Sequence, residues 1–366
     1  MIPIAEPSLG EEELRNVIEA VKSGWISSKG KFIEEFEHKI ANYCGRRYGV
    51  ATSNGTVALH LALKALGIKK GDKVIVPDLT FVAVANSVTY CDAKPVFVDS
   101  HPEYWCIDPE KIGEKISKNT KAIIPVHLYG HPCDMDWIMD IAEDYNLHII
   151  EDAAEAHGAE YKGKKVGSFG DISCFSFYGN KIITTGEGGM CLTDDQNLAE
   201  KMRILRDHGM NPNKRYWYDM IGFNYRMTNL QAAVGVAQLE KMGEFVEKKR
   251  KIAKWYSKRL KELEEKELIK LHPEMSWAKC VYWMYSILIA DKFGMSRDEL
   301  MKKLEEKSVE TRPFFFPMHV LPIYKNNEKF PIAEELSKKG INLPSGTTLT
   351  NEKILQIVKY IEEMTK

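Results

Sequence analysis

The feature that most constrains the fold is an alternation of short β-branched runs with helical patterns, which extends from about residue 47 to about residue 210. Apolar strands separated by helices are typical of a parallel sheet that is covered on both faces. The expected strands lie at 74–77, 95–99, 122–126 and 147–150. The expected helices lie at 80–90 and 134–145, with a further helix beginning at the Asp108-Pro109 pair, which has the residue types of an N-cap and a first-turn proline.

The rest of the chain predicts a second, smaller domain. Residues 229–263 have the pattern of one long helix, which could join two domains. Beyond residue 270 the pattern changes to a strand at 282–289, a helix at 296–307, a Pro/Phe-rich loop and a terminal amphipathic helix. We therefore expect a large α/β domain with a mostly parallel mixed sheet at 1–240 and a small α+β domain at 241–366.

Charge and cysteine content narrow the class of protein. The chain has 51 Lys and Arg against 52 Asp and Glu, a formal net charge of −1, which argues against nucleic-acid and membrane-surface partners. The longest apolar run, at 281–290, is too short to cross a bilayer, and the N-terminus has no signal-peptide pattern. The seven cysteines are scattered and form no CxxC motif. We expect free, mostly buried thiols and a cytoplasmic location.

Three segments carry residues suited to chemistry. The first is Ser53-Asn54-Gly55-Thr56, which lies between a strand-like run and a helical pattern. A turn of small polar residues at a helix N-terminus offers free N–H groups and a dipole to an anion such as a phosphate. Ser53 or Asn54 could equally be a plain helix cap, so both interpretations remain open.

The second segment, 151–158, directly follows a buried strand. Asp152 therefore lies where α/β sheets place their ligands, at the carboxyl end of a parallel strand. It could cap a helix, or it could remain ionised to hold a cationic ring nitrogen. Ala154 is small enough to leave room for a flat ring.

The third segment, 173–190, contains Lys181 between apolar residues and a glycine-rich stretch. A lone lysine is usually a surface charge, but this setting predicts a buried one. Burial depresses the pKa of an amine and makes it a nucleophile toward carbonyl groups. The spacing matches neither a phosphate-binding Walker loop nor a dinucleotide-binding GxGxxG fingerprint.

Together these segments resemble the DegT/DnrJ/EryC1/StrS family of sugar aminotransferases. The similarity also includes the segments 24–27, 222–228 and 311–313, in the same order along nearly the whole chain. The finer patterns at 178–185, 312–319 and 340–346 are similar to the branch of that family formed by GDP-perosamine synthases. A related branch of sugar dehydratases carries His where this chain has Lys181, so Lys181 favours amine transfer.

The resemblance implies an aspartate aminotransferase-like fold of type I and a homodimer with shared active sites. It implies pyridoxal 5′-phosphate, with pyridoxamine 5′-phosphate formed during turnover. Lys181 would hold the cofactor covalently, and Asp152 would pair with its ring nitrogen. The other residues that would surround the cofactor are Ser53, Gly55, Thr56 and Ser176 at the phosphate, Phe81 and Ala154 on the two ring faces, Glu155 near the ring hydroxyl (many relatives carry Gln there), and Asn224 from the neighbouring subunit.

The reaction implied is the transfer of an amino group from L-glutamate to C4 of a nucleotide-linked 4-keto-6-deoxy sugar. The expected acceptor is GDP-4-keto-6-deoxy-D-mannose, which would make the product a precursor of a polysaccharide such as an O-antigen. By resemblance, Trp25, Ser27, Arg312 and His319 lie near the sugar nucleotide. The alternatives are the same chemistry on a UDP- or dTDP-linked sugar, and a cofactor-binding regulator without turnover.

Two patterns have simpler interpretations. His127 and His131, with Asp134 and Asp136, could suggest a metal site, but a strand-end loop with satisfied polar groups is the simpler interpretation. We expect no metal. The aromatic runs 216–218 and 282–283 suit packing or subunit contacts better than stacking on nucleic-acid bases.

Overall fold

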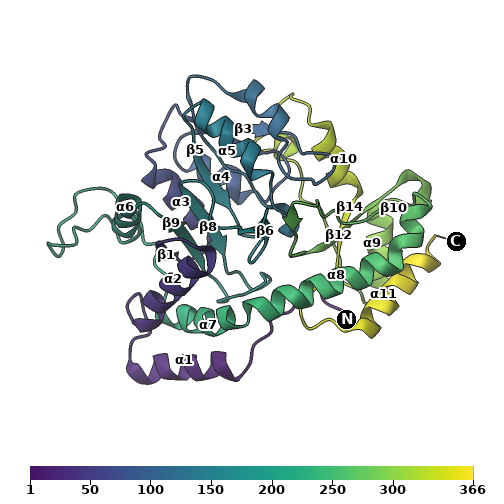
Figure 1. Ribbon diagram of the computed structural model, residues 1–366, viewed down its shortest axis with the longest axis horizontal. Helices are drawn as coiled ribbons and strands as arrows, with labels where there is room; N and C mark the ends of the chain where they lie inside the picture. The colour runs from purple at the N-terminus through teal and green to yellow at the C-terminus, as the bar shows by residue number, and fades with distance from the viewer. Residues whose placement is uncertain (366) are drawn as a thin grey trace.

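The computed structural model describes residues 1–365 and is built around a seven-stranded sheet (Figure 1). The strand order is β1-β9-β8-β5-β4-β2-β3, and every neighbouring pair is parallel except the two pairs made by β9, which are antiparallel. This arrangement confirms the predicted mixed, mostly parallel sheet. In that order the strands are Tyr48–Thr52, Gly189–Thr193, Ile172–Ser176, His148–Asp152, Thr120–Ile123, Lys73–Pro77 and Lys94–Val98.

Helices cover this sheet and bury its central strands. Every residue of β8 and β9 is buried, as expected for apolar strands in a doubly covered sheet. Helix α3 packs on β5, β8 and β9 beside α4 and α6, whereas α2 packs on β1 and β9 beside α7, which in turn contacts α1. These helices and α5 are Glu11–Ser23 (α1), Lys31–Cys44 (α2), Gly55–Ala65 (α3), Ala83–Thr89 (α4), Met135–Asp144 (α5), Gln196–Arg206 (α6) and Asn229–Glu240 (α7).

The C-terminal part forms a second, antiparallel sheet with the order β10-β12-β14-β13. Its strands are Ile269–Lys270, Tyr285–Ile289, Gly340–Leu343 and Arg312–Pro313, and its helices are Met242–Glu265 (α8), Arg297–Glu306 (α9), Pro331–Lys339 (α10) and Asn351–Glu363 (α11). A small third sheet pairs β11 (Ala278–Lys279) with the hairpin of β6 (Glu160–Tyr161) and β7 (Lys164–Lys165). It therefore joins the two parts of the chain.

Two helix predictions need correction. The segment after Asp108 forms only two 3-10 turns, η1 (Pro109–Lys111) and η2 (Gly113–Lys115), although Asp108 does cap the first by accepting a bond from the Glu110 N–H. Gly113 falls where an α-helix would have to continue, which disfavours it.

The long helix expected at 229–263 is two helices, α7 and α8, which meet at Lys241 and follow each other in Figure 1. Lys241 is tied to Glu12 and Glu13 of α1 by ion pairs of 3.1 and 2.8 Å, and Gly243 weakens the helix just beyond it.

The buried apolar side chains form two clusters. The larger surrounds the seven-stranded sheet and includes the first turn of α8 through Phe245 and Val246. The smaller lies between α8, α9, α11 and the antiparallel sheet, and Ile2 from the N-terminus joins it. Helix α8 thus contributes to both clusters; the domain boundary at 240/241 stays a prediction.

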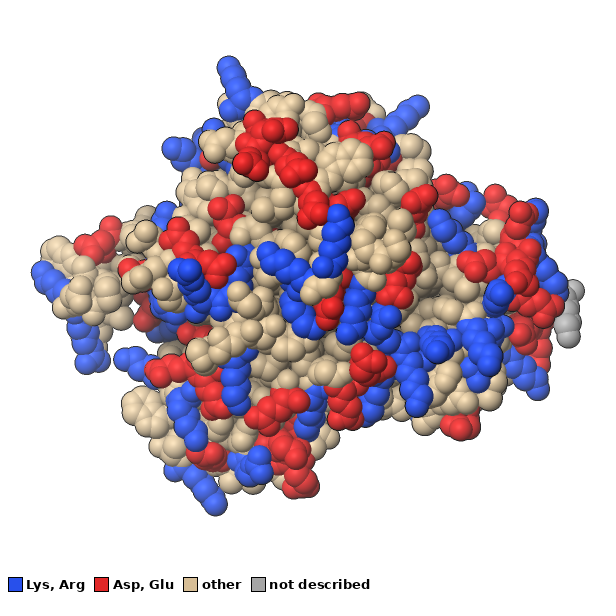
Figure 2. Space-filling model, in the orientation of Figure 1, with Lys and Arg blue, Asp and Glu red and all other residues tan. Residues whose placement is uncertain are grey.

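The surface carries both charges in close mixture, as Figure 2 shows for one face. The lysine-rich stretch of α8 is a solvated helix face, because ion pairs of i,i+4 spacing join Lys248 to Glu244 and Lys266 to Glu262 with exposed side chains. All seven cysteines are free and buried, as predicted. Within residues 1–365, no helix combines the length and apolar character needed to cross a membrane.

Candidate active site

The candidate site lies at the carboxyl edge of the central sheet. Strand β5 ends at Asp152, its parallel neighbour β8 ends at Ser176, and helix α3 begins at Gly55 beside them. Chain segments that leave neighbouring parallel strands at this edge form the usual ligand crevice of an α/β sheet. The sheet therefore brings together the three segments that the sequence singled out.

The start of α3 is built to approach Ser176 closely. Asn54 is the helix cap, because its side chain accepts a 3.0 Å bond from the Val57 N–H. A Cβ added at Gly55 would lie 2.7 Å from the Cβ of Ser176, so only glycine fits between helix and strand. Ser53 donates its backbone N–H to the Tyr225 carbonyl at 2.8 Å. With Asn54 capping the Val57 N–H, the N–H groups of Gly55 and Thr56 lie at the start of the helix on the side of Ser176, an arrangement that suits an anion.

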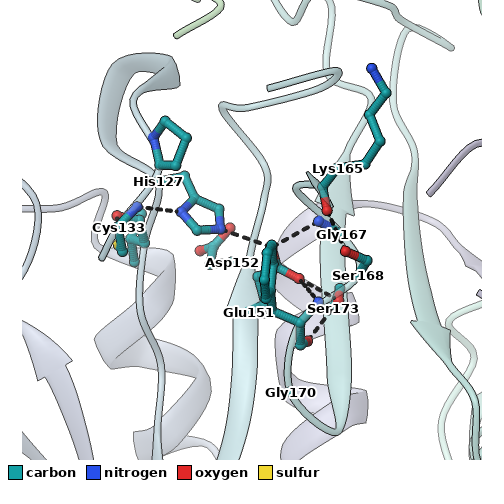
Figure 3. A network of polar contacts seen from close by, with 12 residues as sticks. His127, Cys133, Glu151, Asp152, Lys165, Gly167, Ser168, Gly170 and Ser173 are labelled. Atoms are coloured by element: carbon teal, nitrogen blue, oxygen red, sulfur yellow. Dashed lines mark hydrogen bonds and ion pairs between the residues drawn. The ribbon is translucent and has the colours of Figure 1, made fainter. Parts of the chain in front are cut away.

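A fully buried carboxylate, Glu151, holds the end of β5 in place (Figure 3). It accepts bonds from His127 Nε2 at 2.9 Å, from the N–H groups of Gly167 and Phe169 at 2.7 and 2.9 Å, and from Ser173 Oγ at 2.7 Å. Burial acts to raise the pKa of Glu151, but these bonds outweigh it and the pKa lies below its usual value. A stable anion therefore anchors the residue before Asp152.

Asp152 is 4% exposed and points away from this network, since neighbouring residues of a strand face opposite sides. Its Oδ1 accepts a 3.0 Å bond from the Ala154 N–H. Burial raises the pKa of Asp152, while that bond and the positive charge of Lys181 oppose the rise. A carboxylate held in this way would favour a positively charged partner.

Lys181 lies beside Glu155, with 4.0 Å between Nζ and Oε1, and its side chain is 11% exposed. Burial lowers the pKa of the Lys181 amine, although Glu155 and Asp152 oppose that shift. Burial likewise raises the pKa of Glu155 to about 7, against the charge of Lys181. The second oxygen of Glu155 accepts a 2.8 Å bond from the Tyr129 N–H. The amine and the two carboxyl groups therefore lie in one low-dielectric cluster with perturbed pKa values, a signature of functional sites.

The predicted ring-contacting residues lie on the same edge. Phe81 follows β2 and is 53% exposed, unusually open for a phenylalanine, with its ring 5.8 Å from that of Phe315. Ala154 is half-buried and directly follows the Asp152 turn. An exposed aromatic face suits contact with a flat ligand.

Asn224, Trp25 and Ser27 have no contact with the Lys181 cluster among the hydrogen bonds and ion pairs of residues 1–365. Asn224 is exposed and its Oδ1 accepts a 3.0 Å bond from Arg226 Nε. Trp25 is 57% exposed, and the carbonyls of Trp25 and Ser27 accept bonds from Asn229 at the start of α7. Their proposed roles at a site therefore stay predictions.

Arg312 and His319 differ sharply in exposure. Arg312 Nη2 pairs with Glu310 at 3.2 Å, and its side chain is 52% exposed, so the rest of its guanidinium is accessible to a ligand. His319 is 5% exposed, and its Nδ1 lies 2.7 Å from buried Asp78 while its Nε2 lies 3.4 Å from Glu334. The Asp78 carbonyl also accepts a 2.7 Å bond from the Met318 N–H. His319 thus ties the loop after β13 to the end of β2 and has both ring nitrogens engaged.

The histidines near 130 are satisfied by the chain itself. His127 Nδ1 accepts a 2.9 Å bond from the Cys133 N–H while its Nε2 faces Glu151. His131 Nδ1 bonds the Pro132 carbonyl at 2.7 Å, and its Nε2 accepts from the Met275 N–H at 3.1 Å. Residues 1–365 contain no His, Cys, Asp and Glu group arranged to hold a metal ion.

The sequence interpretation missed two aromatic residues of the cluster. The indole of Trp283 lies under the Lys181 amine, 3.7 Å from Nζ to the ring centroid. Tyr129 stacks at 5.3 Å on Phe315 and donates its backbone N–H to Glu155. Both come from segments far from Lys181 in sequence, and no spacing rule connects them to it.

The residues present fit pyridoxal phosphate. The N–H groups at the start of α3 and the Ser176 hydroxyl suit a phosphate, the buried carboxylate of Asp152 suits a pyridinium nitrogen, and the buried amine of Lys181 suits an aldehyde. All three lie at one edge of the sheet. This agreement rests on the chemistry of the donor groups.

Comparison with known proteins agrees with this geometry. The family model described as the DegT/DnrJ/EryC1/StrS aminotransferase family matches residues 7–362. A GDP-perosamine synthase of Caulobacter vibrioides is 48% identical over 365 residues, covering 99% of this chain and 98% of that protein. One of Escherichia coli O157:H7 is 49% identical, also covering 99% and 98%. The PLP form of a putative sugar aminotransferase of Streptococcus pneumoniae superposes with a TM-score of 0.92 at 26% identity, covering 100% and 98%. The chain belongs to the DegT/DnrJ/EryC1/StrS aminotransferase family.

Proposed function

We propose that this chain is a pyridoxal phosphate-dependent aminotransferase that moves an amino group from L-glutamate to C4 of GDP-4-keto-6-deoxy-D-mannose, forming GDP-perosamine. The observation that carries the proposal is the cluster of Lys181, 11% exposed, with buried Glu155 and Asp152 at the carboxyl edge of the sheet. Identities of 48% and 49% to two GDP-perosamine synthases, over nearly the full length of each, support the choice of substrate.

The cofactor, when bound, supplies the electron sink that stabilises charge at the substrate carbon. The start of α3 and Ser176 would hold its phosphate, with Ser53, Gly55 and Thr56 shaping that turn. Phe81 and Ala154 would flank its ring, and Glu155 would lie near its hydroxyl. Asp152 would keep the ring nitrogen protonated, because an ionised carboxylate beside it favours the cation.

Lys181 has two tasks in this proposal. Its amine binds the cofactor aldehyde, which burial assists by increasing the neutral fraction of the amine. In its free form, Lys181 Nζ would be the group that accepts the proton from the donor Cα and later returns it, acting as a general base and then a general acid. Glu155, at 4.0 Å, is close enough to hold the ammonium form between these steps.

The acceptor would be held from the small-sheet side. Arg312 is exposed at β13 and could pair with a diphosphate through its planar fork of N–H donors. Trp25 and Ser27 would lie near the same ligand. We assign His319 to positioning that loop, because Asp78 and Glu334 already engage its ring.

The site would be completed in a homodimer, with Asn224 reaching the phosphate in the neighbouring subunit. The exposed side chain of Asn224 supports this assignment. We also propose a cytoplasmic location, which the seven buried, unpaired thiols support.

The test is product identification. Purified enzyme receives L-glutamate and, in separate reactions, GDP-, UDP- and dTDP-linked 4-keto-6-deoxy sugars, and products are identified by mass spectrometry and NMR. We expect GDP-perosamine with release of 2-oxoglutarate. Preference for another nucleotide would overturn the acceptor assignment but leave the aminotransferase assignment intact. Lys181→Ala is the blank, in which borohydride should no longer fix the cofactor to the protein.

A variant of Arg312 tests how the acceptor is bound. Arg312→Ala should raise the KM for the keto sugar roughly ten- to a hundredfold, because a bidentate charge-assisted pair contributes about 1.5–3 kcal/mol. The KM for glutamate should change little. Lys302→Ala, which removes an exposed cation from the neighbouring helix α9, is the matched control. Equal effects of Arg312→Ala on both substrates would remove Arg312 from the sugar site.

A further inference from the structure

Trp283 touches the Lys181 amine although it belongs to a different part of the chain. It lies in the segment before β12, and its indole is 5% exposed. Lys181 Nζ lies 3.7 Å from the centroid of the ring, over its face. A cation in this position is attracted by the negative face of the indole, most strongly when water is excluded.

The indole is also fixed to the loop that carries Lys181. Trp283 Nε1–H donates a 2.8 Å bond to the Asn180 carbonyl, the residue immediately before the lysine. This hydrogen bond couples the position of the indole to that of the loop that carries Lys181. The ring of Tyr129, whose backbone N–H donates to Glu155, lies 6.3 Å from the indole with an interplanar angle of 18°.

The backbone of Trp283 is held from two further directions. Lys249 of α8 is 3% exposed, and its Nζ donates 2.7 Å bonds to the carbonyls of Trp283 and Ser345. Gly130 lets the chain approach closely, since a Cβ there would lie 2.7 Å from the Trp283 backbone nitrogen. Val281 completes this clamp by donating its N–H to the Gly130 carbonyl at 3.0 Å.

We propose that Trp283 is a positioning residue for Lys181. Its indole face contacts the lysine amine, and Lys249 and Gly130 fix the position of the Trp283 backbone. The contribution to turnover rests on the proposed function of Lys181. The contact itself does not, and its test can therefore fail or succeed independently of transamination.

The test compares Trp283→Phe with Trp283→Leu. Both variants lose the Nε1 bond to Asn180 and leave an apolar side chain smaller than tryptophan, but only phenylalanine keeps an aromatic face. The titratable groups that face Lys181 are Glu155, Asp152 and His157, and all remain in both variants. The difference between the two variants therefore isolates the contact between amine and ring.

The measured quantity is the pKa of the Lys181 amine in cofactor-free, full-length protein. It is obtained from the pH dependence of labelling by an amine-reactive reagent, followed at the Lys181 peptide by mass spectrometry. Because the aromatic face favours the charged amine, we expect the pKa in the Leu variant to lie about one below that in the Phe variant. At a neutral pH the Leu variant should then be labelled about tenfold faster.

Two controls separate this role from general packing. Trp255→Leu removes a ring on α8 whose centroid lies 5.1 Å from the Nζ of a different lysine, Lys251. This variant should leave Lys181 labelling unchanged. Lys249→Met keeps the indole but removes the hydrogen bond to the Trp283 carbonyl. It should lower the Lys181 pKa, by less than Trp283→Leu does. No change with Lys249→Met would overturn the role of Lys249.

Fluorinated tryptophan provides a test that does not depend on folding of the Leu variant. Fluorine withdraws charge from the face of the ring with little change of shape, so the pKa of Lys181 should fall stepwise as fluorine atoms are added. At the activity level, kcat should fall more in Trp283→Leu than in Trp283→Phe, with KM for both substrates little changed. Equal Lys181 pKa values in Phe and Leu variants, or no response to fluorination, would overturn the proposal.

Discussion

At the scale of single residues, the candidate site contains two adjacent carboxyl groups whose pKa values are shifted in opposite directions. Glu151 has four hydrogen-bond donors around it and a lowered pKa, whereas Asp152 has one donor from Ala154 and a raised pKa. Both are buried, so the difference comes from the number of donors that each finds. Glu151 is satisfied by the protein, and Asp152 retains capacity for an external cation.

This contrast leads to a prediction for Asp152→Asn. The fold should persist, because Asn can still accept the Ala154 bond, but turnover should fall by at least about a hundredfold since an uncharged partner no longer favours a protonated ring nitrogen. Steady-state kinetics and the absorption spectrum of the bound cofactor measure the two effects. Glu151→Gln, one residue away, should instead mainly lower stability. An unchanged rate and spectrum for Asp152→Asn would remove Asp152 from this role.

The raised pKa of Glu155 predicts that the free energy of unfolding depends on pH. Its pKa is about 7 in the folded protein against 4.5 in an unfolded chain, so the folded state keeps a proton that the unfolded state has released. The stability contributed by this group is complete below pH 4.5 and is lost as pH rises toward 7. Glu155→Gln should therefore be more stable than wild type at pH 8 by about 1–3 kcal/mol, and equal to it near pH 4.5.

Urea unfolding of both cofactor-free proteins at the two pH values measures this difference. The glutamine oxygen can still accept the Tyr129 bond, so the comparison reports the charge. A variant that is less stable than wild type at pH 8 would mean that pairing with Lys181 outweighs burial of Glu155.

At the scale of elements, the close approach of α3 to β8 forms the proposed phosphate site. Gly55 begins the helix where a Cβ would meet that of Ser176 at 2.7 Å. Helix α3 is otherwise held by its Asn54 cap and by packing on β5, β8 and β9. The distance between the helix start and the Ser176 hydroxyl is thus set by one missing methyl group.

Gly55→Ala should push the helix start away from Ser176. We expect the affinity for pyridoxal phosphate to fall about tenfold and stability to fall by about 1–3 kcal/mol, the usual cost of overpacking. Equilibrium titration of the cofactor and thermal unfolding measure these changes. Gly243→Ala is the matched control: nothing lies within 4 Å of its added Cβ, and in helix α8 it should stabilise by about 0.5–1 kcal/mol. Unchanged cofactor affinity in Gly55→Ala would place the phosphate elsewhere.

At the scale of the whole molecule, α8 contributes to both hydrophobic clusters, and the segment at Trp283 extends from the small sheet to Lys181. The 210–222 loop projects from the body near α6 in Figure 1 and carries exposed Tyr216, Trp217 and Ile221. Apolar side chains exposed together in this way suit a contact with a second subunit. Asn224 directly follows that loop.

Mixing two inactive variants tests the shared site. If Asn224 serves the neighbouring subunit, a heterodimer of Asn224→Ala and Lys181→Ala has one site with both lesions and one intact site. Activity should therefore return to about a quarter of the wild-type value per total protein, since random exchange gives heterodimers for half of all dimers. Native mass spectrometry confirms the exchange. Heterodimers without activity would assign Asn224 to its own subunit.

Local patterns in the sequence were sufficient for the sheet and for placing Asp152 and Lys181 near its carboxyl edge, whereas their roles toward a cofactor stay predictions. Apolar runs between helical segments specify buried parallel strands, and a carboxylate or a lysine just after such a strand must lie at the carboxyl edge. The patterns failed where local preferences compete: in the Asp108 segment the helix-start signal of Asp108-Pro109 is opposed by Gly113, and the break at Lys241 depends on its ion pairs with α1.

Other features of the site arise only from tertiary structure. The Trp283 indole under Lys181, the engagement of His319 by Asp78, and the donors that distinguish Glu151 from Asp152 all join segments distant in sequence. Periodicity and spacing report only neighbours along the chain. The sequence by itself therefore determined which groups this protein brings to the edge of its sheet, whereas tertiary packing decided their burial, their pKa values and the surface on which the lysine rests.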